Sequence, residues 1–373
     1  MRPPDPPPPP ADQAYAQRLG AIAREHGVTH WGVARADVLD RAHRALVDRR
    51  AAGLADSMQF TYKNPQRSTD PRAAVRGARS VFVCALPYAV DRDGGDGDPA
   101  HQPAGGLTGE IARYAQADYY GALRGTLDAV VATLRVDGWK AVAFADDNSL
   151  VDREVAYRAG LGWFGKNANL LISGAGSWFV LGSVVTTADL PASGGPVSDG
   201  CGSCERCVIA CPTAAIVAPG VIDARRCLSW ILQRPGQIPE DYRVAVGRRL
   251  YGCDDCQTSC PPTVVLGRRV ATEPADRRSH LDLVELLETD DEALVVAWGR
   301  WYLADRDPRW IRRNALVALG NALAEGPAPS VAEQAHAEAV LDRYVGGIDA
   351  LLADHARWAR TRARRRAGGG GAR

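Results

Sequence analysis

The first half of the chain alternates helical and strand patterns of hydrophobic residues. Apolar residues recur at helical spacing from Tyr15 to Ala23, after a possible cap at Asp12, and again from Leu123 to Leu134. A further helix is predicted at 150–159, and five strands are predicted between and after the helices. These strands lie at residues 28–34, 78–86, 139–145, 170–172 and 178–186. The run at 78–86 is almost wholly apolar, which is typical of a strand covered on both faces. The alternation predicts an α/β domain over residues 12–192.

The pattern changes after residue 281, where strand signals fade. Apolar residues then recur at helical spacing in five segments, at 284–287, 294–298, 310–323, 331–345 and 348–358. Short amphipathic helices joined by short loops indicate a stack of helical repeats over residues 281–360. Between the two halves, a loop from residue 193 opens a cysteine-rich domain that we place at 193–265.

Both ends of the chain have a biased composition. Prolines dominate residues 1–11 and predict a disordered or polyproline II tail. Residues 361–373 are rich in arginine and glycine, which predicts a basic flexible tail. That tail is either simply solvated or makes a weak contact to a polyanion.

The overall composition narrows the class of protein. The 373 residues include 45 lysines and arginines against 44 acidic residues, so no strong net field draws the chain to nucleic acid or membrane. The proline-rich N-terminus lacks the apolar segment of a signal peptide, and no apolar run is long enough to cross a bilayer. We therefore expect a cytoplasmic protein with no membrane contact.

Nine cysteines are present, and eight of them fall between Cys201 and Cys260. The ninth, Cys84, lies inside the apolar run at 78–86 and is expected to be a small core residue rather than a ligand. The first four of the eight have the spacing C-x2-C-x2-C-x3-C and are followed by proline, which is the bacterial ferredoxin run. In that run three thiolates bind one iron–sulfur cube and the fourth binds a second cube.

A second set completes the ligands of two [4Fe–4S] clusters. By the crossover of the ferredoxin run, one cluster is held by Cys201, Cys204, Cys207 and Cys260. The other is held by Cys211, Cys227, Cys253 and Cys256. The alternative is zinc, but all-cysteine zinc sites usually show paired C-x2-C knuckles, which this spacing does not follow. Two clusters in one domain carry single electrons, so an acceptor site is expected outside it.

The segment from Asp146 to Gly182 is the candidate reaction site. Asp146 and Asp147 follow the predicted strand 139–145, and ligands bind at the carboxyl edge of open α/β sheets. The glycines of GLGWFG at 160–165 allow close approach to a large flat ligand, and Lys166 and Asn167 could hold a polar substituent. Taken alone, such aspartates are more often loop or capping residues, and Trp163 and Trp178 more often core.

Several segments together resemble the epoxyqueuosine reductase family. They are MQFTYKNPQRSTDPRA, IARYAQADYY, AGLGWFGKN, GSWFVLG, CGSCERCVIACPTAAI, DARRCLSW and YGCDDCQTSCP. Near the C-terminus, DPRWIRRNALVALGN and LLADHARWA resemble the HEAT-like helical domain of that family. The resemblance runs in order over residues 12–360, so it is more specific than a ferredoxin run alone.

The resemblance implies a fold, an activity and cofactors. The fold is α/β plus α: an N-terminal cobalamin-binding domain, a ferredoxin-like insert for two clusters, and HEAT-like repeats. The enzyme would reduce epoxyqueuosine to queuosine at the wobble position of a tRNA anticodon, the last step of queuosine biosynthesis. Cobalamin would sit between the α/β domain and the insert and receive electrons from the clusters. The partners implied are tRNA and an external low-potential electron donor, and the chain is expected to be a monomer.

The resemblance also assigns roles to individual residues. Aligning Arg153 with the arginine of the family's D-S-x-P-x-x-E-R segment makes Asp146 the proton donor. An apolar site would raise the pKa of Asp146 and suit it to that role. The residues assigned to cobalamin are Arg67, Arg113, Tyr114, Asp146, Lys166, Ser177, Asp254 and Asp255. Asp152, Ser149 and Tyr120 depart from the family's usual glutamate, proline and histidine around the pocket.

Two other functions remain as alternatives. A reductive dehalogenase would share the cluster and cobalamin half, but that class usually carries a twin-arginine signal and lacks a HEAT-like end. A non-catalytic electron-transfer protein would need fewer residues and would leave Asp146 and GLGWFGKN without a role. For contacts to tRNA we consider Arg309, Arg312 and Arg313 as surface candidates, against an ordinary solvated helix face.

Overall fold

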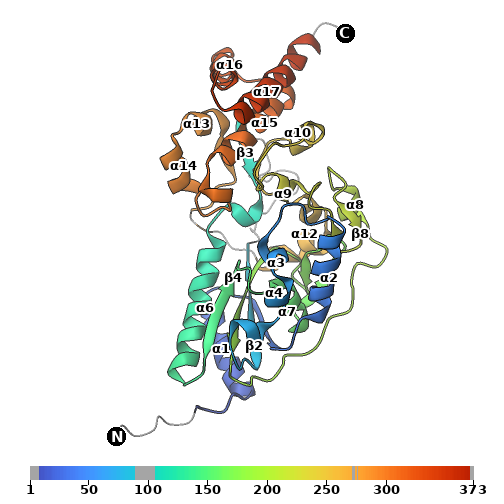
Figure 1. The fold of residues 1–373 in the computed structure, drawn as a ribbon, viewed down its shortest axis with the longest axis vertical. Coiled ribbons are helices and arrows are strands. Elements are labelled where there is room, and N and C mark those ends of the chain that lie inside the picture. The colour runs from blue at the N-terminus through green and yellow to red at the C-terminus, as the bar shows by residue number, and fades with distance from the viewer. Residues whose placement is uncertain (1–7, 89–105, 271–273, 275, 370–373) are drawn as a thin grey trace.

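The computed structural model describes residues 8–88, 106–270, 274 and 276–369. In Figure 1 the α/β part occupies the bottom of the view, the cysteine-rich segment lies at its upper right, and the C-terminal helices form the top. Residues 89–105, most of the N-terminal tail and residues 370–373 lie outside the described residues. Within the described part, no helix has both the length and the apolar character that crossing a membrane requires.

A four-stranded sheet forms the centre of the α/β part. Its order is β1 (His30–Arg35), β2 (Ser80–Pro87), β7 (Phe179–Thr186) and β4 (Ala141–Ala145), and all three pairings are antiparallel. These strands fall where the hydrophobic pattern predicts them. The argument that placed a ligand at a shared carboxyl edge does not apply, because carboxyl ends of neighbouring antiparallel strands point in opposite directions.

Helices cover both faces of this sheet, which explains the apolar run of β2. Every residue of β2 is buried. Phe82, Cys84 and Leu86 face one core with α1 (Gln13–Glu25) and α6 (Tyr119–Val136). Val81, Val83 and Ala85 face a second core with α7 (Asp152–Arg158). Successive strand residues point to opposite faces, so a strand covered on both sides has no polar alternation.

Shorter elements connect the strands and border the site. Between β1 and β2 lie α2 (Asp40–Ala51), α3 (Phe60–Lys63), α4 (Pro65–Ser68) and α5 (Pro71–Ala74). A hairpin of β5 (Gly162–Phe164) and β6 (Leu170–Ile172) follows α7. Gly162 leaves no room for a side chain, because a Cβ there would lie 1.9 Å from the carbonyl oxygen of Leu171. Gly162 thus serves the close pairing of the hairpin itself.

The cysteine-rich segment consists of short elements. In chain order they are α8 (Arg206–Ile209), β8 (Ile216–Ala218), β9 (Val221–Ile222), α9 (Leu228–Ile231), α10 (Glu240–Val246), β10 (Arg249–Tyr251), α11 (Asp255–Thr258) and α12 (Pro261–Gly267). The strand β10 pairs parallel with β3 (Thr108–Ile111) from the first half of the chain, and β3 pairs antiparallel with β11 (His280–Asp282). This small sheet ties together all three predicted domains and was not foreseen, since each strand is only three or four residues long.

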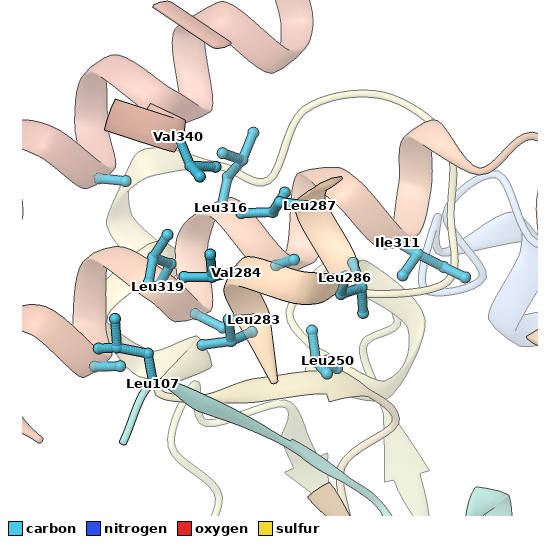
Figure 2. Close-up of a cluster of buried hydrophobic side chains, with 14 of the residues drawn as sticks. Leu107, Leu250, Leu283, Val284, Leu286, Leu287, Ile311, Leu316, Leu319 and Val340 are labelled. Carbon is cyan, nitrogen blue, oxygen red and sulfur yellow. The ribbon is translucent and has the colours of Figure 1, made fainter. Parts of the chain in front are cut away.

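The C-terminal helices pack around α15. They are α13 (Leu283–Glu288), α14 (Asp291–Trp298), α15 (Arg309–Glu325), α16 (Val331–Val345) and α17 (Ala350–Gly369). Figure 2 shows their core, where Leu283, Leu287 and Leu316 meet Leu107 and Leu250 from the earlier segments. The helix α17 runs to Gly369, so the predicted tail from residue 361 is helical over most of its length.

The central position of α15 corrects two surface assignments. Arg313 is fully buried and Arg312 is 9% exposed, whereas the Arg309 side chain is half exposed. Every residue of α15 from Trp310 to Leu323 is buried. The periodicity of a helix predicts one exposed face, but neighbours on all sides of α15 leave no such face. Arg312 and Arg313 therefore cannot be surface contacts to tRNA.

Candidate iron–sulfur and reaction sites

The backbone around the cysteines repeats one local structure twice. The helices α8 and α11 follow Glu205 and Asp254, whose dihedral angles nearly coincide (φ −128° and ψ 16° against φ −125° and ψ 17°). Each helix then carries a cysteine at its second position, Cys207 or Cys256, and the next cysteine follows two residues after the helix ends. The two helices are in contact. This duplication is the arrangement that a pair of ferredoxin runs predicts.

Two thiols lie near other cysteines of their predicted group, although no three Cys, His, Asp or Glu side chains of the described residues lie close enough together to hold a metal ion. Burial raises the pKa of the Cys207 thiol, and the thiols of Cys260, Cys201 and Cys204 raise it further. Burial raises the pKa of Cys256 far above its usual value, with Cys253 and then Cys227 adding to the effect. Such sites hold thiolates only with a cation to compensate the buried charge. The assignment of each cysteine to a cluster stays a prediction.

Two adjoining cavities connect the cysteines to Asp146. The first, of about 570 Å³, is lined by all four cysteines of the second predicted set, namely Cys211, Cys227, Cys253 and Cys256. The second, of about 1120 Å³, is lined by Asp146 and Lys166 among others. Tyr114, Tyr120 and Gln233 line both, so the cavities share a wall. Asp146 and the second predicted cysteine set therefore border neighbouring cavities.

Asp146 is the first residue of the loop that follows β4. Its backbone is left-handed, with φ at +51°, which is uncommon for a residue other than glycine and often marks a functional site. The Asp147 carboxylate accepts a hydrogen bond from the Ser149 amide at 2.7 Å and fixes the turn. Burial raises the pKa of Asp146, the Arg124 guanidinium opposes this, and Asp147 adds to it. The Asp146 side chain lines the larger cavity and is exposed to solvent there.

A second carboxyl lies beside Asp146. Asp152 begins α7 and lines the same cavity, and its Oδ1 atom is buried without a hydrogen-bond partner. Burial raises the pKa of Asp152 well above its usual value, and the Asp146 charge raises it further. The phenol of Tyr120 also has a raised pKa, through burial and then through these two aspartates. The two departures noted in the sequence thus adjoin the predicted proton donor.

The residues assigned to cobalamin are only partly brought together. Tyr114 lines both cavities, Asp146 and Lys166 line the larger one, and Ser177 and Asp255 the smaller one. Ser177 Oγ accepts a hydrogen bond from Gln257 at 3.1 Å, and Asp255 pairs with Arg249 at 2.7 Å through both oxygens. The three others are outside both linings: Arg67 is exposed on α4, Arg113 stacks on Trp178 at 4.6 Å, and Asp254 accepts the Arg113 amide at 3.1 Å.

An aromatic group at the cavity border was missed in the sequence. Phe60 lies edge-on to Tyr302 at 4.9 Å and to Trp230 at 5.8 Å between ring centroids. These residues come from α3, α9 and the loop after α14, one from each predicted domain. Tyr302 is 41% exposed, and Phe60 has φ at +23°. The density of aromatic residues in WGRWY at 298–302 was the available signal.

Duplicated cysteine loops next to a cavity lined by adjacent carboxyls indicate an iron–sulfur oxidoreductase. Residues 200–263 match the family described as the 4Fe-4S double cluster binding domain. An epoxyqueuosine reductase of Xanthomonas campestris is 35% identical over 82% of this chain and 87% of its own length. One of Burkholderia pseudomallei is 34% identical over 92% of this chain and 91% of its own. The chain belongs to the epoxyqueuosine reductase family.

Solved structures agree with this membership. An epoxyqueuosine reductase from Bacillus subtilis, with its catalytic aspartate loop swung out of the active site, superposes with a TM-score of 0.80 at 27% identity. A second epoxyqueuosine reductase structure, with an epoxyqueuosine-modified tRNA-Tyr stem loop, gives 0.81 at 27% identity. Each match covers 94% of this chain and 90% of the other.

Proposed function

We propose that this chain reduces the epoxide of epoxyqueuosine in tRNA to the alkene of queuosine. The observation that carries the proposal is its similarity to epoxyqueuosine reductases over most of both chains, one of them solved with a modified stem loop. The two alternatives lose support because the whole length, C-terminal helices included, matches these reductases. The reaction takes up two electrons and two protons, releases the epoxide oxygen as water and leaves a carbon–carbon double bond.

Cobalamin is proposed for the two adjoining cavities. The fit rests on a large shared space between the α/β part and the cysteine-rich segment, with the second cysteine set in its wall. Tyr114, Lys166 and Asp146 would border the group. When bound, cobalamin supplies a metal that accepts electrons singly and is nucleophilic toward carbon. The clusters are proposed as two, held by the two cysteine groups, and would pass electrons inward.

Asp146 is proposed to give a proton to the departing oxygen. Its raised pKa keeps a larger fraction of the carboxyl protonated near neutral pH than an ordinary aspartate. In the Bacillus subtilis relative the catalytic aspartate also belongs to a loop that moves. The left-handed backbone of Asp146 fits a loop with an alternative conformation.

The tRNA is proposed to enter beside the C-terminal helices. Arg300 and Tyr302 from that part line the larger cavity opposite Arg41 and Arg49 of α2. Cationic and aromatic side chains suit the phosphates and unstacked bases of an anticodon loop. The stacking of α15, α16 and α17 is proposed to be the HEAT-like repeat that the sequence resembles.

The test is nucleoside analysis of tRNA incubated with anaerobic protein, cobalamin and a reductant. We expect queuosine to form as its epoxide disappears. Asp146→Asn should lower the rate at least ~100-fold, which is the usual contribution of a general acid. Asp147→Asn, which removes the charge of the adjacent turn carboxyl and leaves Asp146 in place, is the matched control and should stay within about tenfold of wild type. Unchanged turnover in Asp146→Asn with cofactor bound would contradict the assignment.

A further inference from the structure

Two exposed aliphatic side chains mark an open groove on the cysteine-rich segment. Ile209 on α8 is 82% exposed, and Val265 on α12 is 63% exposed. Both line one groove of about 500 Å³ together with Pro261 and Val264, and Arg206 is the one charged side chain in its described lining. Neither Ile209 nor Val265 lines the two cavities of the reaction site. Pro261 and Val264 join these two side chains into one apolar groove, so they are not isolated exposed residues.

The groove is built on the backbone that carries the first predicted cluster. Ile209 lies two residues after Cys207, and Pro261 directly follows Cys260. The helices α8 and α12 are joined through α11, which contacts both. A protein that covers this groove would therefore contact residues that are close in sequence to the predicted ligands of the first cluster.

The burial of the cysteines sets a direction for electrons. Cys204 of the first set is exposed to solvent. In the second set, Cys253 and Cys256 line the inner cavity, which adjoins the cavity of Asp146. The first cluster is thus the outer one and the second the inner one. An electron that arrives from outside reaches the first cluster first.

We propose that the groove around Ile209 and Val265 is the docking site of a small electron-carrier protein with an acidic rim. The acidic rim would face Arg206, and an apolar patch near the carrier's redox centre would cover the two aliphatic side chains. This rests on the proposed function, in which the clusters supply the electrons. Each encounter would pass one electron from the carrier to the outer cluster, so two encounters would supply the two electrons of one turnover.

The size of the groove favours such a partner over a second copy of this chain. Transient redox encounters bury less than about 1,200 Å² in total, whereas stable dimers usually bury about 2,000 Å² or more. Four apolar residues around a shallow groove suit the smaller class, and fast release suits a carrier that must leave after each electron. A variant that changed the oligomeric state would point to the second copy instead.

The experiment compares two electron sources on the full-length protein with clusters and cobalamin. One source is flavodoxin kept reduced by its NADPH-dependent reductase, and the other is sodium dithionite, which needs no docking site. In Val265→Glu, Ile209→Glu and Arg206→Glu the flavodoxin-driven rate of queuosine formation should fall about tenfold, as a loss of about 1.4 kcal/mol of binding predicts. The dithionite-driven rate should stay near wild type. Val217→Glu, 46% exposed on β8 and outside the groove, is the matched control.

The ratio of the two rates decides the outcome. A ratio lowered threefold or more in the groove variants, with Val217→Glu unchanged, supports docking at the groove. A smaller change in Val265→Glu and Ile209→Glu overturns it, and so does an equal loss with both reductants. If wild type forms no queuosine with dithionite, the proposed function fails, and that result is distinct from a failure of docking.

Discussion

The buried guanidinium of Arg313 offers the sharpest test of how the C-terminal helices are held. Its Nη1 atom donates to the carbonyl oxygens of Arg234 (2.8 Å) and Gly236 (2.6 Å), and its Nη2 atom to those of Ile231 (3.0 Å) and Leu232 (3.1 Å). No ion pair with a carboxylate is found for it among the described residues. Burial lowers the pKa of Arg313 to about 9, so it remains a cation at neutral pH.

These contacts allow the loss of folding stability in Arg313→Leu to be worked out. Four carbonyl oxygens would lose a donor, but that of Leu232 would keep the Asn314 amide at 2.8 Å. The other three would each cost about 1–3 kcal/mol where nothing replaces the donor. Burial of a leucine returns about 2 kcal/mol. A net loss of about 4 kcal/mol follows, which lowers the melting temperature by roughly 5 °C for a chain of this length that unfolds as one unit.

Thermal unfolding followed by circular dichroism at a fixed scan rate measures this loss. Arg309→Leu on the same helix is the matched control, because its side chain is half exposed and pairs with Asp307 at the surface. Its cost should stay below about 1 kcal/mol. If Arg313→Leu melted like the control but bound tRNA more weakly, Arg313 would be a surface contact and the reasoning would be wrong.

Two further predictions follow from buried titratable groups. Asp152→Asn should lower kcat at least ~10-fold with little change in KM, since it removes a carboxyl that can store a proton beside Asp146. Asp152→Glu keeps the carboxyl and should retain activity. Equal kinetics for Asp152→Asn and wild type would exclude a role of Asp152 in proton transfer. Burial lowers the pKa of His355 to about 4, so the unfolded chain takes up a proton below pH 6.5 that the folded chain refuses. Stability should be complete above pH 6.5 and about 2 kcal/mol lower at pH 5. His355→Gln should flatten this part of the melting profile, and parallel profiles would count against it.

Hydrophobic periodicity predicted the central helices and strands, because the burial of one or both faces of an element determines where its apolar residues fall in the sequence. The strands β2, β4, β6 and β7 lie where apolar runs place them, and both faces of β2 are covered as its composition indicates. The same reasoning failed for β3, β10 and β11. Their pairing joins residues more than 100 positions apart, and three or four residues show no period.

The candidate site was predictable where chemistry imposes a spacing. Cysteine intervals allowed two ligand groups to be written down, and the assignment of the cysteines to these groups stays a prediction. Asp146 could be named only through a family resemblance. Two of the assigned arginines, Arg67 and Arg113, do not line the cavities, because a motif match says nothing about which way a side chain points.

The sequence by itself determined the family, the two cysteine groups and the strands of the central sheet. These features depend on the spacing of nearby residues and on the periodicity of apolar residues, and both can be read directly from the sequence. Only the tertiary structure decided that Arg312 and Arg313 are buried, that Asp152 adjoins Asp146, and that Ile209 and Val265 share a groove. Each of these depends on contacts between distant segments, whose energies no local pattern contains.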